Sequence, residues 1–133
     1  MRRIREHQKM HCGDTLLIPA PGTCQETPHL WIILTDPDPL CIIVCLSTLR
    51  HGKDQTVLLR RGDHAFVNRD TTALYAFSQI TDVNNLIQQV ADGLAVPRER
   101  CAPAILKLMQ DGILASPETP RKIQEFYRAR ARR

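Results

Sequence analysis

The sequence lacks any apolar run that approaches the roughly 20 residues of a membrane-spanning helix. It also lacks a signal-peptide core, because the charged start MRRIREHQKM leads into no apolar stretch. From these two absences we expect a cytoplasmic protein. The 133 residues, 43% hydrophobic and 24% charged, are typical of an ordinary globular protein with one domain.

The cysteine spacing of a disulfide framework or a zinc ribbon is missing too. The chain has five cysteines, an odd number, and no C-x-x-C pair. Cys41 and Cys45 lie four residues apart, but on a strand they are two separate positions of one face. We therefore expect reduced structural thiols and no bound metal; a metal held by His11, Cys12 and His29 is the weaker alternative.

Nucleotide and hydrolase motifs are absent as well. There is no G-x-x-x-x-G-K-[ST] loop, no G-x-G-x-x-G turn and no H-E-x-x-H helix. Ser47 lies outside any G-x-S-x-G setting, which argues against a hydrolase elbow. We expect no cofactor.

Basic residues are concentrated at the two ends of the chain. Residues 1–10 hold four basic groups against one acidic group, and residues 121–133 hold six against one. Residues 11–120 hold eight basic against twelve acidic groups, so the formal net charge of +4 comes from the tails. We expect a folded core without a broad phosphate-binding surface, and tails that are either solvated ends or contacts for nucleic acid.

The first two thirds of the chain favour β structure and the last third favours helices. Short apolar runs between Gly, Pro and Asp turns predict a small barrel or a strongly bent sheet. Regular apolar spacing after residue 82 predicts helices. We expect an α+β fold in which residues 1–12 are a basic extension, 13–82 a barrel of about five strands and 83–133 a helical part. The expected strands are Thr15–Pro19, Leu30–Thr35, Cys41–Leu46, Thr56–Leu59 and Ala73–Thr81.

Capping residues predict where the helices begin and end. Asp82 is the expected cap of a first helix that Gly93 ends. A second helix over Ala102–Gln110 is expected to stop at Gly112. Ser116–Pro117 and Thr119–Pro120 both fit a cap followed by proline, which predicts a third helix that runs into the basic tail 121–133.

The loop DPDPL allows a prediction of strand register. If Thr35 and Cys41 close this loop, Trp31 faces Cys45 and His29 faces Ser47 across an antiparallel hairpin. His29 and Ser47 then lie at the open end of the outer face, with their Cβ atoms about 5 Å apart. The six apolar residues between these positions form the inner face: Leu30, Ile32, Leu34, Ile42, Val44 and Leu46.

Residues of this kind suit RNA cleavage. The reaction needs a base for the ribose 2′-hydroxyl, an acid for the leaving 5′-oxygen, and donors that stabilise the charged phosphorane. Histidine suits both proton transfers at neutral pH. The candidate catalytic residues are His29, Ser47, His64 and Thr71. A backbone bond that fixes the Gly62 turn is the alternative for His64, and a local turn beside Asp70 is the alternative for Thr71.

The order of motifs resembles the PemK/MazF-like toxins, and is most similar to a divergent branch with a GDHxF-type element. The likeness covers about residues 13–80, through GDTLLIP, HLWIILTDP, IIVCLSTLR, KDQTVLLRRGDHAF and DTTALY. It implies an SH3-like barrel that commonly dimerises. It also implies an endoribonuclease that cleaves single-stranded RNA without metal, inhibits growth and is held in check by an antitoxin.

The resemblance extends to particular residues. Gly13 and Asp14 match the opening GD of the family, and its catalytic Thr or Ser falls on Ser47 or Thr48. His29 stands where the family often has a catalytic arginine; a histidine replaces it as acid or base but not as a permanent phosphate clamp. Tyr75 is the expected base-stacking residue. The candidate RNA-binding residues are Arg50, Arg60, Arg61, Arg69 and Tyr75.

Two other functions compete with the nuclease. One is a non-catalytic SH3-like module that binds a protein partner and has lost the arginine. The other is a nucleic-acid-binding regulator that uses the Arg-rich end 121–133. The role of the helical third is open: it covers the sheet, builds a dimer or binds an antitoxin.

Overall fold

The computed structural model of the chain describes residues 9–19 and 28–131. Cys24 and the outer parts of both basic tails lie outside the described residues. Within them, six strands and three helices follow one another. These are β1 (Thr15–Ile18), β2 (His29–Ile33), β3 (Leu40–Thr48), β4 (Leu58–Leu59), β5 (Thr71–Asp82), α1 (Val83–Ala91), β6 (Val96–Arg98), α2 (Pro103–Ala115) and α3 (Arg121–Ala131).

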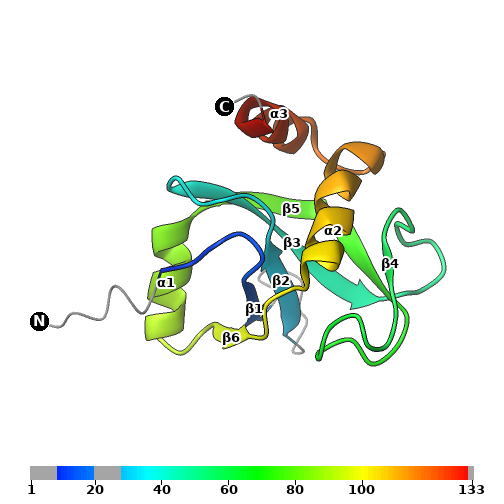
Figure 1. The fold of residues 1–133 in the computed structure, drawn as a ribbon, viewed down its shortest axis with the longest axis horizontal. Coiled ribbons are helices and arrows are strands. Elements are labelled where there is room, and N and C mark those ends of the chain that lie inside the picture. Colours follow the sequence, from blue (N-terminus) through cyan, green and yellow to red (C-terminus); the bar gives the residue numbers. More distant parts are fainter. Residues whose placement is uncertain (1–8, 20–27, 132–133) are drawn as a thin grey trace, which may run out of the picture.

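The strands form one antiparallel sheet that curls into a half-barrel (Figure 1). Their order across the sheet is β4-β5-β3-β2-β1-β6. The pairing of β3 with β5 shifts between Ile43, which faces Gln79, and Cys45, which faces Leu74. Such a bulge bends a strand and increases its twist. The α+β class and the strongly bent sheet predicted from the sequence are confirmed.

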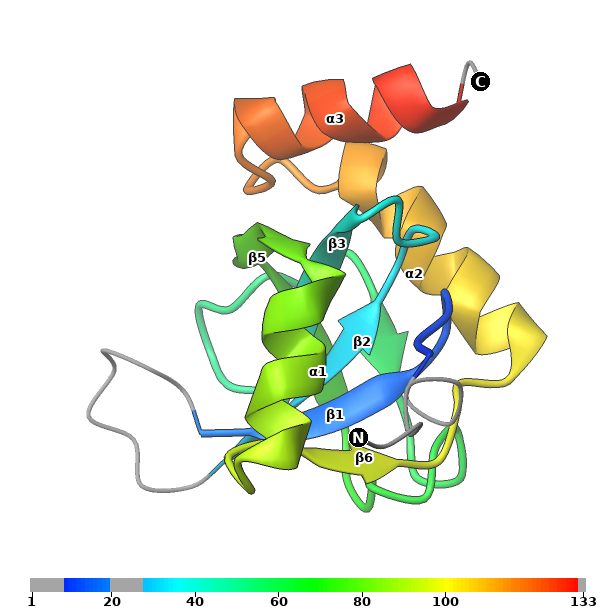
Figure 2. The same ribbon diagram turned by 90° about the vertical axis from the view of Figure 1, so that its left-hand side faces the viewer.

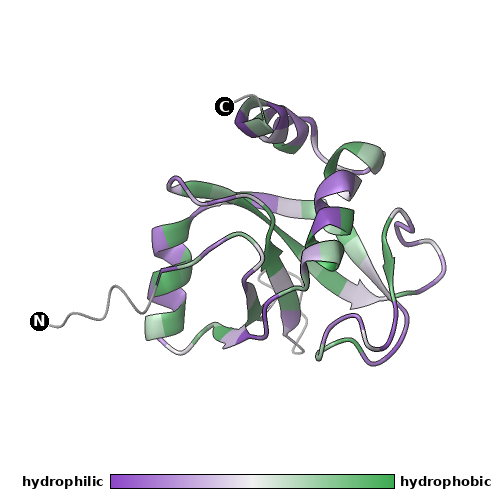
Figure 3. Ribbon diagram, viewed as in Figure 1, coloured by the Kyte–Doolittle hydropathy of each residue, from purple (hydrophilic) through white to green (hydrophobic). Residues whose placement is uncertain are grey.

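The predicted hairpin register is confirmed where β2 pairs with β3. Trp31 pairs with Cys45 and Ile33 pairs with Ile43. The six apolar residues assigned to the inner face are all buried in one core, together with side chains from α2 and α3. Burying an aliphatic side chain of this size stabilises the fold by about 1.5–3 kcal/mol. Figure 3 shows how hydrophobic residues gather on the strands between the helices.

The other face of the sheet has a second core beneath α1. Trp31, Ile33, Ile43 and Cys45 are buried there with Leu86 of α1, and Figure 2 shows α1 lying across the strands. Helices therefore pack against both faces of the sheet. None of the helices in the two described ranges is long and apolar enough to span a membrane.

The predicted ends of the first helix are correct. The Asp82 carboxylate accepts a hydrogen bond from the Asn84 backbone N–H, with an N···O distance of 2.8 Å. Gly93, with a φ of +79°, follows the last turn. The third helix begins directly after Pro120, as one of the two proposed cap pairs predicted.

Two expectations for the last third are wrong. The second helix does not stop at Gly112 but continues to Ala115, and the space above Gly112 is filled by the Tyr75 side chain. The region expected to be helical also contains β6, which pairs with β1 and makes a sixth strand. Pro97 in its middle is tolerated because β6 is an edge strand.

The described part of the basic tail is packed against the fold. The Arg130 guanidinium donates hydrogen bonds to the carbonyl oxygens of Asp36 in the hairpin loop and of Leu40 at the start of β3, both at 2.9 Å. It also stands 4.5 Å from the centre of the Phe126 ring. This arginine therefore supports the β2–β3 loop.

Candidate functional site

A cleft of about 1040 Å³ opens on the sheet face that carries Trp31 and Cys45. Four cations, from the loops and from β6, contribute to its walls: Arg50, Lys53, Arg69 and Arg98. The described residues that line the cleft include no Asp or Glu. Positive charge is thus concentrated here although residues 11–120 carry an acidic excess. The sequence predicted no broad basic surface from the net charge of residues 11–120, but this net charge does not describe the cleft, where four cations gather.

The lining of the cleft includes the first two predicted catalytic residues. His29 and Ser47 both line it. They are the next residues on the same face after the Trp31–Cys45 pair, His29 along β2 and Ser47 along β3, because side chains alternate between faces. The sequence-based placement of these two residues in one site is therefore consistent with the cleft.

Two ring nitrogens of residues that line the cleft are buried without a hydrogen-bond partner in the described structure. They are Nδ1 of His29 and Nε1 of Trp31, whose side chain is only 5% exposed. The indole N–H is a donor only, and a buried donor without an acceptor costs about 1–3 kcal/mol. Both nitrogens have almost no solvent-accessible surface, so neither is open to a molecule in the cleft.

Lys53 is a cation of the cleft that the sequence did not single out. Its Nζ donates hydrogen bonds to the Ser47 hydroxyl at 2.5 Å and to the Thr48 carbonyl oxygen at 3.2 Å. Burial lowers the pKa of the Lys53 ammonium, as does the nearby Arg50 charge, while Cys45 acts in the opposite direction. The cleft therefore contains an ammonium group that is fixed in place and loses its proton more readily than usual.

Asp54 anchors the loop that carries Lys53. Its buried carboxylate accepts hydrogen bonds from the Ser116 hydroxyl at 2.6 Å and from the Thr56 backbone N–H at 2.9 Å. The Thr72 hydroxyl donates to its backbone carbonyl oxygen. The loop is thus tied to the end of α2 and to β5. Burial alone would raise the pKa of Asp54, but the hydrogen bonds from Ser116 and Thr56 outweigh it and lower that pKa.

We expect Asp54→Asn to lower the free energy of unfolding by about 1–3 kcal/mol at pH 7, because the amide NH₂ that replaces one carboxylate oxygen cannot accept the bond from the Ser116 hydroxyl. The carboxylate's pKa is lower in the folded chain than its ordinary value of 3.8. Its stabilising effect is therefore complete above that pH and is lost as the pH falls further, through the folded pKa. Urea unfolding measures this effect. The difference in free energy of unfolding between wild type and Asp54→Asn should be smaller at pH 3 than at pH 7.

The exposed Asp70 provides the control for this prediction. Asp70→Asn should change stability by less than about 0.5 kcal/mol at pH 7. Equal losses from both variants would show that Asp54 has no special anchoring role.

Aromatic rings stand beside the cations of the cleft. Phe66 and Phe77 both line it, and Phe77 is 56% exposed. The Arg98 guanidinium lies 5.6 Å from the centre of the Phe66 ring. Flat apolar faces next to positive charge are typical of surfaces that stack unpaired bases along a phosphate backbone.

Thr71, Arg50 and Arg69, three other predicted site residues, also line the cleft. The Thr71 hydroxyl donates to the carbonyl oxygen of Arg69 at 2.7 Å, which is the local turn considered as its alternative. In this state its single proton is engaged. Thr71 therefore shapes the wall between β5 and the preceding loop.

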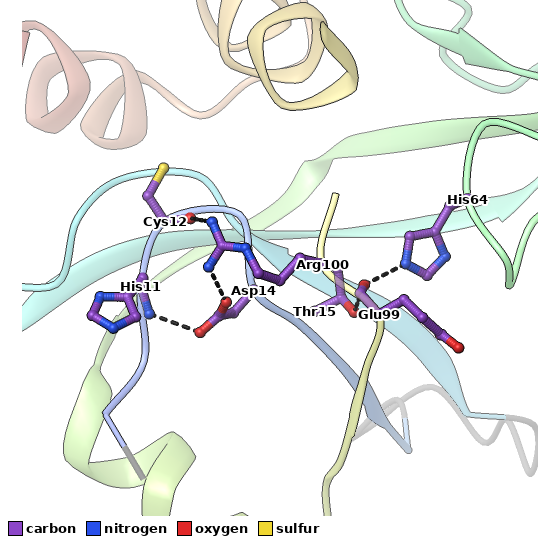
Figure 4. A network of polar contacts seen from close by, with 7 residues as sticks. All are labelled: His11, Cys12, Asp14, Thr15, His64, Glu99 and Arg100. Carbon is purple, nitrogen blue, oxygen red and sulfur yellow. Dashed lines mark hydrogen bonds and ion pairs between the residues drawn. The ribbon is translucent and has the colours of Figure 1, made fainter. Parts of the chain in front are cut away.

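His64 does not line the cleft, and Figure 4 shows its ring beside Glu99. Its Nδ1 accepts from the Phe66 backbone N–H at 2.9 Å, so Nε2 carries the proton and donates to the Glu99 carbonyl oxygen at 2.5 Å. The Thr15 hydroxyl donates to the same oxygen at 2.7 Å. Both ring nitrogens are engaged in joining the loop to β1 and β6, so we leave His64 out of the proposed site.

Gly13 and Asp14, which match the opening GD of the family, hold the start of the sheet in place, and Figure 4 shows the contacts of Asp14. The Asp14 carboxylate pairs with the Arg100 guanidinium at 2.6 Å and accepts from the His11 backbone N–H at 2.8 Å. Gly13, at a φ of +95°, makes the turn before β1. These contacts join the start of the sheet to the segment after β6.

Three predicted RNA-binding residues lie elsewhere. Tyr75 is fully buried and its hydroxyl donates to the Met109 carbonyl oxygen at 2.7 Å, so its ring is unavailable for stacking and that prediction is corrected. Arg60 and Arg61 are exposed in the turn after β4 but do not line the cleft. Their contact with RNA stays a prediction.

The cysteines that the structure describes are free thiols. They are Cys12, Cys41, Cys45 and Cys101, and burial raises the pKa of each to about 11. Among the described residues no group of three or more His, Cys, Asp or Glu side chains is placed to hold a metal ion. No protein-family model matches the chain, and no curated protein matches it.

Proposed function

We propose that this protein is an endoribonuclease that cleaves single-stranded RNA in the cationic cleft, and that it acts as the toxin of a toxin–antitoxin pair. One observation carries the proposal. His29 and Ser47 line a cleft whose described walls hold four cations and no carboxylate. Such a lining attracts a phosphate backbone and repels no part of it.

These two residues match the chemistry of RNA cleavage. The His29 imidazole is suited to remove the proton of a ribose 2′-hydroxyl, and that oxygen then attacks the adjacent phosphorus. The Ser47 hydroxyl and the nearby cations are suited to stabilise charge on the phosphorane. The products would be a 2′,3′-cyclic phosphate and a free 5′-hydroxyl. None of these steps requires a metal ion.

The walls favour a single strand over a duplex. Phe66 and Phe77 offer ring faces for unpaired bases, while Arg50, Arg69 and Arg98 are placed for phosphates. Bases in a duplex are already stacked on one another and cannot use these rings.

The curled six-stranded sheet is compatible with an SH3-like barrel. We further propose a cytoplasmic homodimer whose activity is held in check by an antitoxin protein.

The test is incubation of the purified chain with mixed-sequence single-stranded RNA in EDTA. We expect fragments that end in cyclic phosphate, RNA binding that weakens steeply with salt, and growth arrest on expression. A His29→Ala/Ser47→Ala double variant should bind RNA but not cleave it. If the wild type neither cleaves RNA nor arrests growth, the nuclease proposal fails and a non-catalytic binding module becomes the better interpretation.

A further inference from the structure

Lys53 differs in chemistry from the three arginines of the cleft. An arginine keeps its proton at any pH that proteins tolerate, whereas a lysine whose charge is disfavoured by its surroundings can give one up. Lys53 is also held in position, because its Nζ is bonded to Ser47 Oγ and to the Thr48 carbonyl oxygen. An acid catalyst needs both properties.

The lining of the cleft offers few other proton donors for a leaving group. It contains no described Asp or Glu, and burial keeps the Cys45 thiol protonated, with a pKa of about 11. Thr71 already uses its proton on the Arg69 carbonyl oxygen. If His29 is the base, Lys53 is the ionisable group that remains.

We propose that Lys53 is the general acid of the reaction, an inference that rests on the proposed nuclease function. His29 takes the proton of the 2′-hydroxyl as the bond from O2′ to phosphorus forms. The bond from phosphorus to O5′ breaks, its electron pair stays on O5′, and that oxygen takes a proton from Lys53 Nζ. Afterwards the imidazolium loses a proton to water and the lysine amine regains one.

The geometry supports this division of roles. Lys53 reaches across from the loop to Ser47 at the end of β3, and His29 lies on the neighbouring strand β2. The proposal places the scissile phosphate between these two groups, with His29 towards O2′ and Lys53 towards O5′. Burial and the Arg50 charge, which lower the pKa of Lys53, also make it the stronger acid.

The test compares two RNA substrates that differ in one atom. The position cleaved by the wild type is first mapped, and an oligonucleotide is then made with sulfur in place of the 5′-bridging oxygen there. A thiolate leaves without a proton, so this substrate needs no general acid. We expect Lys53→Met to cleave the all-oxygen RNA about 100- to 10,000-fold more slowly than the wild type. On the sulfur substrate it should come within a few-fold of the wild type.

Two further variants distinguish proton donation by Lys53 from the effect of a positive charge in the cleft. Lys53→Arg keeps the charge but has no proton to give, so we expect the same selective loss on the all-oxygen RNA. Arg69→Met, the matched control from the same cleft, should lose a similar factor on both substrates. Equal losses on both substrates for Lys53→Met would overturn the acid role. If the wild type cleaves neither substrate, the nuclease proposal itself fails, and the inference falls with it.

Discussion

Replacing His29 with alanine is expected to lower the RNA cleavage rate about 100- to 10,000-fold, the usual contribution of a positioned acid or base. His29 lines the cleft, and its Nδ1 has no partner among the described residues. Because Nδ1 is buried, the proposed proton transfer falls to the other ring nitrogen, Nε2. The four cations of the cleft remain in the variant, so the dissociation constant for RNA should change only a few-fold.

Single-turnover rates and equilibrium binding on the same oligonucleotide measure the two effects separately. His51→Ala is the matched control, because His51 is exposed in the loop after β3 and does not line the cleft. It should leave both quantities unchanged. Wild-type cleavage rates in His29→Ala would mean that the base is another residue, while weakened binding at an unchanged rate would make His29 a substrate contact only.

The sequence predicted the part of the site that lies on the β2–β3 hairpin, because a hairpin follows regular rules of pairing and alternation. A loop of known length fixes the register of a hairpin, and alternation then places residues two apart on one face. These two rules place His29 and Ser47 on one face of the hairpin, and both residues line the cleft. The inner-face core of the same hairpin follows from the same rules, and it is confirmed.

The sequence placed Tyr75 in the site and did not single out Phe77, which lies in a bulge of β5. Strict alternation puts Tyr75 and Phe77 on one face of a strand. The register shift opposite Ile43 and Cys45 separates them, so Tyr75 enters the core under α2 while Phe77 lines the cleft. Within this irregular stretch the Ser78 hydroxyl donates to the Tyr75 carbonyl oxygen at 2.6 Å. No pattern in the sequence marks the position of such a bulge.

Lys53 and Arg98 could not be predicted from the sequence because their positions depend on contacts between distant segments. Lys53 follows the turn at Gly52, and its loop is held by contacts of Asp54 with α2 and β5. Arg98 belongs to a three-residue edge strand, which is too short to show a period. Charges that are spread along an acidic stretch of chain become a basic cleft only when the sheet curls.

Gly112→Ala is the change with the largest expected effect on stability. Alanine in the interior of a helix normally stabilises it by about 1 kcal/mol relative to glycine. Here a Cβ would overlap the Tyr75 hydroxyl and lie 2.6 Å from Tyr75 Cζ and 2.8 Å from Val57 Cγ2. Tyr75 is fully buried and bonded to the Met109 carbonyl oxygen, so its ring cannot move away freely. We expect the free energy of unfolding to fall by about 2–3 kcal/mol.

A double-mutant cycle tests the cause of this loss. Tyr75→Phe removes the hydroxyl oxygen, the atom nearest to the added methyl group, at a cost of about 1 kcal/mol for the lost hydrogen bond. In the Tyr75→Phe/Gly112→Ala double variant the total loss should therefore be smaller than the sum of the two single losses, since they share one contact. Recovery will be partial, because the ring carbon and Val57 remain close. Strictly additive losses, or a stabilising Gly112→Ala, would show that α2 does not rest on Tyr75. In that case the support that α2 gives to β5 behind the cleft would have to come from other residues.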